Sequence, residues 1–341
     1  MRISSITLLW AAGVTALAAS DKLERETEGR HPGDLVDVIV QWKAGDESAA
    51  RARFAARGQA QRELPLLKAT VYPMRKADAQ ALQNDSGIKV LTGDAGVRGH
   101  QATDPGPDYG WVTAFRLTDP MAGTFTYRGE GIGIAILDSG VDPSYSELIK
   151  SSGVKSVVYE ESFVAGEAAK DDFFGHGTHI AGLIASNAAA STGYGFDYRV
   201  RGVAPWASLI NLKVLDKNGY GSEAAVIAAI DRAIQLKSRY NIRVLNLSLG
   251  RAATRSYLDD PLCLAVKKAW DVGIVVVISA GNEGRNNTFA NSGYGTITSP
   301  GTSPWAITVG AMNTRRTMWP GDDQLTSYSS KGPTAIDKIA K

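Results

Sequence analysis

Three short stretches of the sequence carry residue types that could promote attack on a carbonyl group. Asp138 ends the apolar run I-A-I-L, and His176 stands between two glycines in G-H-G-T-H-I-A-G. Asn282 follows the apolar run at 274–278. A carboxylate can hold an imidazole in one tautomer and stabilise its protonated form. A side-chain amide can stabilise the negative oxygen of a tetrahedral intermediate. The three side chains therefore indicate an orienting acid, a base and an oxyanion donor.

Two of these residues also have a plainer interpretation. Asp138 precedes Ser-Gly and could cap a turn, as Asp often does, and Asn282 could do the same beside a glycine. Asp142 is a weaker candidate than Asp138 because it lies past the turn. His179 shares a helical face with His176. A zinc site would need further ligands, and the neighbouring sequence does not supply them.

In order and setting, the three stretches resemble the subtilisin-like serine proteases (subtilases), and the resemblance covers residues 34–341. It implies that Asp138 and His176 are the acid and base of an Asp-His-Ser triad, with Asn282 as the oxyanion donor. In that family the nucleophilic serine comes last, inside G-T-S-M-A-x-P. The 341 residues contain no such stretch. We therefore expect the nucleophile to lie outside this chain, and the 341 residues alone to be inactive.

Ser303 is the one serine in a G-T-S setting that could be mistaken for the nucleophile. In this family the nucleophile opens a helix of small residues, whereas Ser303 is followed by a proline and then by W-A-I-T-V-G, which is typical of a strand. We therefore expect Ser303 not to be catalytic.

The resemblance also implies which residues would contact a peptide substrate. Two glycine-containing segments, K-N-G-Y-G and N-L-S-L-G, would form walls that an extended peptide joins as an additional strand. The substrate-binding residues implied are Ser248, Leu249, Gly250, Gly219, Tyr220, Gly221, Ala280 and Gly281. Of these, Ala280 and Gly281 would line the primary specificity pocket, which would then favour apolar or aromatic side chains.

The amino-terminal residues 1–19 have the features of a secretory signal peptide. Arg2 precedes an apolar run at 6–19 that ends in A-L-A-A-S, which includes an A-x-A cleavage site. An uncleaved anchor is the alternative, but the run is shorter than the roughly 20 residues that span a bilayer. Residues 20–33 are polar and are expected to be a spacer. The pattern predicts export, to the medium or the periplasm.

Residues 34–99 are expected to form a small α/β domain. Strands are predicted at 36–42, 66–73 and 88–92, and helices at 47–63 and 76–84. By its position this module resembles the propeptide of subtilases, which acts as an intramolecular chaperone and occupies the active site until it is cut. An unrelated α/β module is the alternative.

Residues 97–110 are loop-like, with several glycines and prolines. We expect the autoprocessing cut near this segment, without being able to place the bond. His31 and His100 lie in polar, loop-like sequence and need no chemical role.

Residues 100–341 are expected to form the peptidase domain. Apolar strands alternate with helical stretches, which predicts a doubly wound, mostly parallel α/β sheet. The expected strands are 133–137, 209–214, 244–247, 274–278 and 306–309, and the expected helices are 176–189, 222–237 and 261–271.

Composition narrows the possible partners. The apolar fraction of 44% and the 36 glycines suit a globular α/β protein. A net charge of +2 predicts neither a nucleic-acid nor an anionic-membrane partner. Cys263 is the only cysteine, and its helical setting predicts a buried, inert thiol. We expect no cofactor. A structural calcium ion is possible by resemblance, near Glu147, but one carboxylate is poor evidence because calcium takes six to eight oxygens.

The sequence therefore predicts a secreted, monomeric serine endopeptidase that acts on proteins or peptides and is inhibited by its own propeptide. Two alternatives stay open. The chain could be a non-catalytic peptide-binding protein of the same fold, or the amino-terminal module could be an inhibitor of other proteases.

Overall fold

The computed structural model describes residues 23, 27–100, 127–150, 153–191, 200–288, 290–315 and 319–341. They divide into two compact units, Met1–Ala95 and Gly96–Lys341. The expected signal peptide at 1–19 lies outside the described residues. Among the described residues, no helix combines the length and apolarity needed to cross a membrane.

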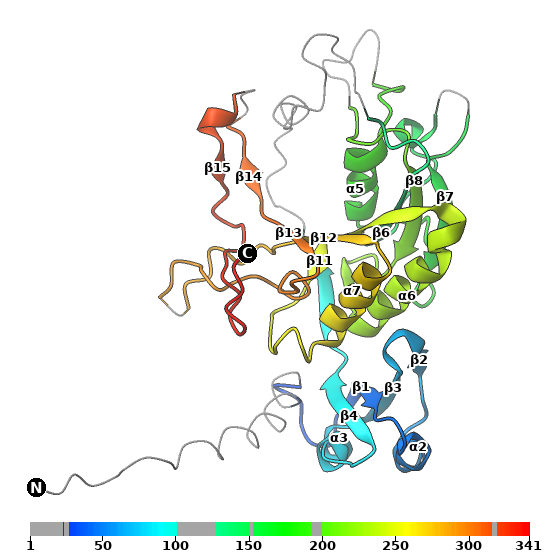
Figure 1. Ribbon diagram of the computed structural model, residues 1–341, viewed down its shortest axis with the longest axis vertical. Helices are drawn as coiled ribbons and strands as arrows, with labels where there is room; N and C mark the ends of the chain where they lie inside the picture. The colour runs from blue at the N-terminus through cyan, green and yellow to red at the C-terminus, as the bar shows by residue number, and fades with distance from the viewer. Residues whose placement is uncertain are drawn as a thin grey trace, which may run out of the picture. The chain divides into compact units, whose positions relative to one another are not determined.

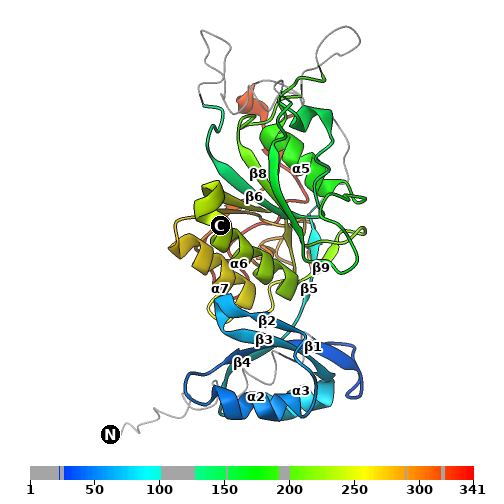
Figure 2. The same cartoon turned by 90° about the vertical axis from the view of Figure 1, so that its right-hand side faces the viewer.

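The first unit is a four-stranded sheet in the order β2-β3-β1-β4, with antiparallel pairing throughout (Figure 1). Its elements are β1 (Leu35–Trp42), α2 (Glu47–Ala55), β2 (Arg62–Leu64), β3 (Ala69–Arg75), α3 (Lys76–Leu82) and β4 (Ile88–Gly93). Both helices lie on one face of the sheet (Figure 2). Alternation along β1 turns Val36, Val38 and Val40 into the core, where they join Phe54 and Tyr72.

The helix predicted at 47–63 was too long. It ends at Ala55, and Arg62–Leu64 forms an additional strand. The chain turns at Gly58, where a Cβ atom would lie 2.2 Å from the carbonyl oxygen of Pro73. This close approach to β3 requires glycine and directs the following residues back along the sheet.

The second unit is built on a six-stranded parallel sheet in the order β13-β12-β10-β6-β8-β7. Its strands are β6 (Gly133–Asp138), β7 (Val157–Ser162), β8 (Ser208–Lys213), β10 (Ile242–Leu247), β12 (Val275–Ser279) and β13 (Ile307–Val309). Helices α6 (Glu223–Tyr240) and α7 (Pro261–Asp271) pack together on one face, and α5 (His176–Ala185) lies on the other (Figure 2). This confirms the predicted doubly wound α/β fold.

All the strands and helices predicted for this unit form, with some ends shifted by a few residues. The helix predicted at 176–189 ends at Ala185. Ser186 departs from helical conformation (ψ 132°), and its hydroxyl donates to the carbonyl of Val200. Helix α6 runs beyond its predicted end to Tyr240, where Asn241 closes it in the left-handed conformation (φ 47°). Strand β7 was missed because its pattern is mostly half-buried or exposed.

Two smaller sheets complete the second unit. One pairs β14 (Met312–Asn313) with β15 (Gln324–Leu325). The other has the order β11-β5-β9 and consists of β5 (Gly96–Gly99), β9 (Tyr220–Ser222) and β11 (Leu249–Gly250). The prediction of a loop from residue 97 was therefore wrong for 97–99. The rest of that segment, 101–110, lies outside the described residues.

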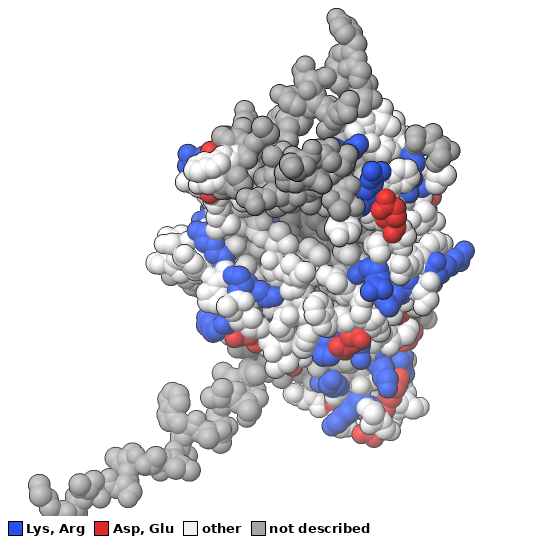
Figure 3. Space-filling view, turned by 45° about the horizontal axis from the view of Figure 1, so that its top comes forward, with Lys and Arg blue, Asp and Glu red and all other residues white. Residues whose placement is uncertain are grey.

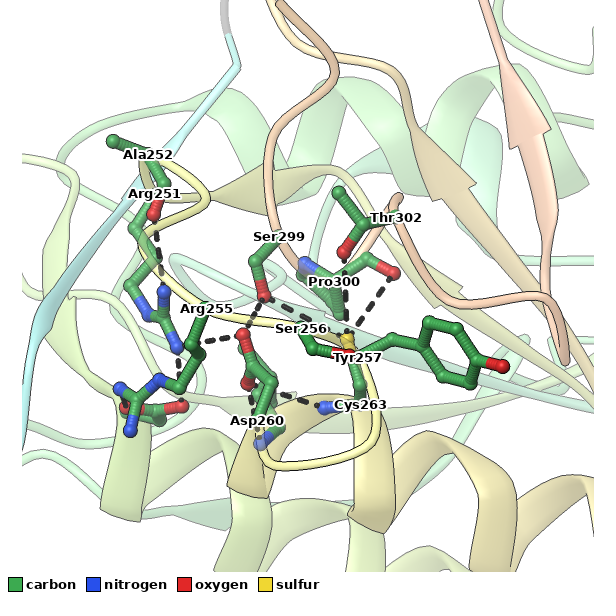
Figure 4. Close-up of polar contacts among 12 residues, drawn as sticks. Arg251, Ala252, Arg255, Ser256, Tyr257, Asp260, Cys263, Ser299, Pro300 and Thr302 are labelled. Carbon is green, nitrogen blue, oxygen red and sulfur yellow. Dashed lines mark hydrogen bonds and ion pairs between the residues drawn. The ribbon is translucent and has the colours of Figure 1, made fainter. Parts of the chain in front are cut away.

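Four buried charged side chains tie β11 to the ends of two helices (Figure 4). Arg251, directly after β11, lies 2.9 Å from both Glu223 at the start of α6 and Asp260 at the start of α7. Arg255 adds a 3.4 Å contact to Glu223, and Ser299 donates to Asp260 at 2.8 Å. Two positive charges thus balance two negative ones. Burial alone would raise the pKa of Asp260, but Arg251 and Arg255 outweigh it and hold that pKa below 3.8.

Cys263 lies one turn into α7 and is fully buried beside this cluster. Burial raises the pKa of its thiol well above 9.0. A thiol that stays protonated is a poor nucleophile, so the side chain is a packing residue, as its sequence setting predicts.

Replacing Arg251 tests how much the balance of buried charges contributes to the stability of the fold. We expect Arg251→Ala to lower the free energy of unfolding by about 3–5 kcal/mol, because it strands buried carboxylates without one of their partners. Urea denaturation followed by circular dichroism measures this. The matched control is Arg232→Ala, which removes a partly exposed pair to Glu161 and should cost less than about 1 kcal/mol. Equal losses in the two variants would contradict the interpretation.

Candidate active site

The structure brings the predicted acid and base into direct contact. Asp138 is the last residue of β6 and His176 is the first of α5. Nδ1 of His176 lies 2.6 Å from Oδ1 of Asp138, and the two side chains are 4% and 1% exposed. This hydrogen bond directs Nδ1 at the carboxylate and leaves Nε2 to face a reacting group, which is the arrangement a general base needs.

Glycines allow α5 to approach the end of β6 this closely. A Cβ atom on Gly177 would lie 2.0 Å from the carbonyl oxygen of Gly140 and 3.2 Å from Cβ of Asp138. Gly175 caps the helix in the left-handed conformation (φ 83°), which favours glycine. The small residues around His176 therefore serve the contact between helix and strand.

Two further residues that the sequence analysis did not single out hold the helix start in place. Ser139 accepts a hydrogen bond from the Gly177 amide at 3.0 Å and donates to Asp172 at 2.7 Å. Asp172 also accepts from the amides of Gly175, at 2.9 Å, and Thr178, at 2.7 Å. The signal that could have revealed Asp172 is an Asp shortly before a helix start, where carboxylates satisfy free amides.

Lys213 is a third positioning residue that was missed. It ends β8, is fully buried, and donates to the carbonyl oxygens of Ser139 and Asp171. Its Nζ also lies 3.1 Å from the carboxylate of Glu167. A buried ammonium needs such partners, and here they fix the turn that follows Asp138. In sequence Lys213 looks like an ordinary lysine at a strand end, so only its partners reveal the role.

Opposing influences set the pKa of His176. Burial of the imidazole lowers it, but the hydrogen bond and charge of Asp138 raise it, and Asp172 and the backbone of His100 raise it further. The net result is a pKa above the ordinary 6.5. His176 is therefore a stronger base than a free imidazole.

The weaker candidates take structural positions. Asp142 accepts from the amide of Ser144 at 2.8 Å and from its hydroxyl at 2.6 Å, which closes a turn. His179 is exposed on the outer side of α5. Glu147 is buried, and one of its carboxylate oxygens lies 3.2 Å from the hydroxyl oxygen of Ser186. Within the described part of the chain, His, Cys, Asp and Glu form no group of three or more that could hold a metal ion.

All six predicted wall residues flank one strand of the chain itself. On one side, β5 pairs with β11, so that Leu249 is opposite Gly99 and Gly250 is opposite Arg98. Ser248 joins this wall through its carbonyl oxygen, which accepts from the amide of His100 at 2.8 Å.

On the other side, β5 pairs with β9, so that Tyr220 is opposite Arg98 and Gly221 is opposite Val97. The Gly219 carbonyl accepts from the amide of Gly99 at 3.1 Å. The walls therefore bind an extended segment from both edges through backbone groups, as strand addition requires.

The other predicted site residues lie where β12 ends. Ala280, Gly281 and Asn282 follow Ser279, the last residue of that strand. Parallel strands end at one edge of their sheet, so this segment shares its edge with Asp138. A Cβ atom on Gly281 would lie 2.7 Å from Cγ2 of Thr298, so that neighbour leaves no room for a side chain.

Ser303 is not positioned as a nucleophile. It is fully buried, and its Oγ accepts a hydrogen bond from the amide of Trp305 at 3.3 Å. A hydroxyl enclosed in this way cannot reach a substrate carbonyl.

We expect His176 to titrate above pH 6.5, as measured by NMR of labelled histidine. In Asp138→Asn the pKa should fall below 6.5, because burial remains while the charge that opposed it is lost. Asp142→Asn is the matched control and should leave the His176 titration unchanged, since Asp142 only closes a turn with Ser144. An unchanged pKa in Asp138→Asn would show that the carboxylate does not govern this base.

Comparison with known proteins places this geometry in a family. The sequence profile of the subtilase family matches residues 129–341. Serine protease AprX of Bacillus subtilis (strain 168) is 38% identical over 222 residues, which cover 62% of this chain and 45% of AprX. Subtilisin E of the same organism is 31% identical over 340 residues, which cover 98% of this chain and 78% of subtilisin E.

Solved structures agree on the fold. Sphericase is 28% identical with a TM-score of 0.52, and the match covers 69% of each chain. Fervidolysin from Fervidobacterium pennivorans, a keratinolytic enzyme related to subtilisin, has a TM-score of 0.62 at 22% identity. That match covers 87% of this chain and 46% of fervidolysin. The chain thus spans less than half of AprX and of fervidolysin, but more than three quarters of subtilisin E. It belongs to the subtilase family of serine proteases.

Proposed function

We propose that this chain is the precursor of a secreted serine endopeptidase that hydrolyses peptide bonds through an acyl-enzyme. The observation that carries the proposal is the buried contact of 2.6 Å between His176 and Asp138. It lies at the end of a cleft in which an extended segment is held between β9 and β11. A base with a raised pKa beside a bound peptide backbone is suited to acyl transfer.

In this proposal His176 Nε2 accepts the proton of a serine hydroxyl as its oxygen attacks the peptide carbonyl carbon. Asp138 stabilises the imidazolium that forms, and Asn282 donates to the developing oxyanion. The imidazolium then protonates the leaving amine. Water attacks the acyl-enzyme by the same route and releases the carboxylate. Following the family pattern, we place the serine outside these 341 residues.

The proposed substrates are proteins and peptides in extended conformation. The cleft binds such a segment through backbone hydrogen bonds, which any sequence can form. On the face shown in Figure 3, Lys and Arg side chains are scattered among Asp, Glu and uncharged residues. With a net charge of +2, this distribution supports a polypeptide partner over a polyanion.

The proposal includes a zymogen. The strand that fills the cleft, Gly96–Gly99, is the last part of residues 34–99 and directly follows the first compact unit in the sequence. This supports a role for residues 34–99 as a propeptide that ends in the cleft. Export through a signal peptide at 1–19 and a monomeric state belong to the same proposal.

A non-catalytic peptide-binding protein of the same fold is the second candidate, because the filled cleft by itself demonstrates only binding. The two candidates differ in whether a serine completes the site. The acid and base would have no chemical task in a binding protein.

The complete gene product separates the candidates. We expect it to hydrolyse fluorescent casein and to react with a fluorophosphonate probe. Asp138→Asn and His176→Ala should each lower kcat by about 10⁴-fold, the effect of disabling a triad member. Asp142→Asn is the matched control and should stay within about twofold of the unmodified protein. We also expect the 341 residues alone to show neither activity.

The pH profile supplies an independent check. Activity should fall on the acid side with an apparent pKa above 6.5, because only neutral His176 can accept a proton and its pKa is raised. Hydrolysis or labelling that survives both substitutions would rule out the acid–base assignment. Complete inactivity combined with binding of added peptide would favour the second candidate.

A further inference from the structure

The described part of the segment in the cleft includes His100, a histidine that no role in the proposed triad explains. Three successive residues of this segment are held by backbone contacts: Arg98 opposite Gly250, Gly99 opposite Leu249, and His100 through its amide to the carbonyl of Ser248 at 2.8 Å. His100 is therefore positioned by the wall itself.

The carbonyl group of His100 lies beside the proposed base. The segment passes close to the base, since a Cβ atom on Gly99 would lie 3.6 Å from Nδ1 of His176, and the backbone of His100 raises the pKa of His176. A contact that raises this pKa stabilises the protonated ring, so the imidazole donates and the backbone carbonyl accepts. The His100 carbonyl is thus the peptide group presented to His176.

The His100 ring occupies the pocket expected for primary specificity. Its Nδ1 lies 2.6 Å from Oγ of Ser279, the residue directly before Ala280. On the opposite wall, a Cβ atom on Gly250 would lie 2.8 Å from Cε1 of His100. The pocket therefore has one hydroxyl aimed at a ring nitrogen and one wall bare of side chain where the ring lies.

The residue before His100 is also constrained. A Cβ atom on Gly99 would lie 3.3 Å from Cδ1 of Leu215, 3.5 Å from Cε1 of Phe174 and 3.6 Å from Nδ1 of His176. The distances to Phe174 and His176 are ordinary van der Waals contacts, and only the contact with the end of the Leu215 side chain is tight. The cleft therefore favours a small residue before the histidine.

We propose that this pocket selects histidine through Ser279, and that the chain is consequently cut on the carboxyl side of His100. The inference rests on the proposed peptidase function and identifies the processing bond and the specificity residue. It also changes the earlier expectation of an apolar or aromatic preference, because that expectation considered Ala280 and Gly281 without Ser279.

The proposed cut proceeds by the same steps as the hydrolysis of any other peptide bond by this site. The serine oxygen bonds to the carbonyl carbon of His100, the C–N bond to the next residue breaks, and His176 transfers the proton to the leaving amine. Water then releases the His100 carboxylate. The product segment would remain paired to both walls, since Val97–His100 lie on the acyl side of the bond.

Because His100 is buried in the pocket, the docking of residues 97–100 in the cleft depends on pH. Burial lowers the pKa of His100 to about 4, and the charges of Arg98, on the same strand, and His176, on α5, add to the effect. A released His100 would titrate near the ordinary 6.5. Between pH 6.5 and pH 4, His100 is protonated in the released segment but neutral in the docked one. Protonation of His100 therefore lowers the equilibrium constant for docking about tenfold for each pH unit that the pH falls.

The first experiment finds the cut. Intact-mass spectrometry of the complete gene product should give an amino-terminal fragment ending at His100 and a mature chain starting at Gln101. If the protein hydrolyses casein but its amino-terminal fragment ends at a residue other than His100, this inference is wrong and the proposed peptidase function still stands. Failure to hydrolyse casein or to process at all would overturn the proposed function as well.

A double substitution tests the role of Ser279. In the unmodified pocket, His100→Phe should slow processing about 2- to 10-fold, the worth of one hydrogen bond. In the Ser279→Ala background, His100→Phe should leave the processing rate unchanged or raise it. Comparing His with Phe within each pocket cancels any general effect of Ser279→Ala on folding. Equal ratios in both pockets would contradict selection by Ser279.

The 341-residue chain tests the seating without any catalysis. Histidine NMR should place the pKa of His100 near 4, whereas a value near 6.5 would show that the ring is not in the pocket. Amide hydrogen exchange at Gly99, corrected for intrinsic rates, should show about 20-fold more opening at pH 5 than at pH 7. His100→Gln is the control that should remove this dependence, and Ile136 in β6 should show none in either chain.

Discussion

The close approach of α5 to the end of β6 is the constraint on which this site depends. A hydrogen bond of 2.6 Å between His176 and Asp138 requires the helix backbone to touch the turn after the strand. No side chain fits between them, because a Cβ atom on Gly177 would lie 2.0 Å from the Gly140 carbonyl. The hydrogen bonds of Ser139 and Asp172 then fix the angle at which the helix arrives.

Without β5, the cleft would be a sheet that lacks its middle strand. Strands β9 and β11 do not pair with each other, and each exposes an edge that β5 satisfies. Unpaired edges of this kind recruit extended segments of almost any sequence. Selectivity must therefore come from positions where a side chain leaves the strand, and in this molecule such a position is occupied by His100 against Ser279.

The buried charges behind the cleft link its wall to the body of the fold. Arg251 follows the wall strand β11 directly, and its backbone bridges to Ser299 while its side chain joins Glu223 and Asp260 at the starts of two helices. Movement of the wall would separate charges that are almost completely out of water, which is costly. This explains how a strand of only two residues, Leu249–Gly250, can hold its position beside β5.

The sequence by itself determined the doubly wound sheet and the likeness to subtilases, because buried parallel strands require continuous apolar runs such as I-A-I-L. It also led to Asp138 and His176 through their glycine-rich settings. Lys213 and the arginines of the charge cluster were missed, since nothing local distinguishes a buried lysine or arginine from an exposed one. Tertiary structure alone decided the role of His100. Its loop-like sequence becomes a strand end only because β9 and β11, more than a hundred residues later, supply the hydrogen bonds that hold it.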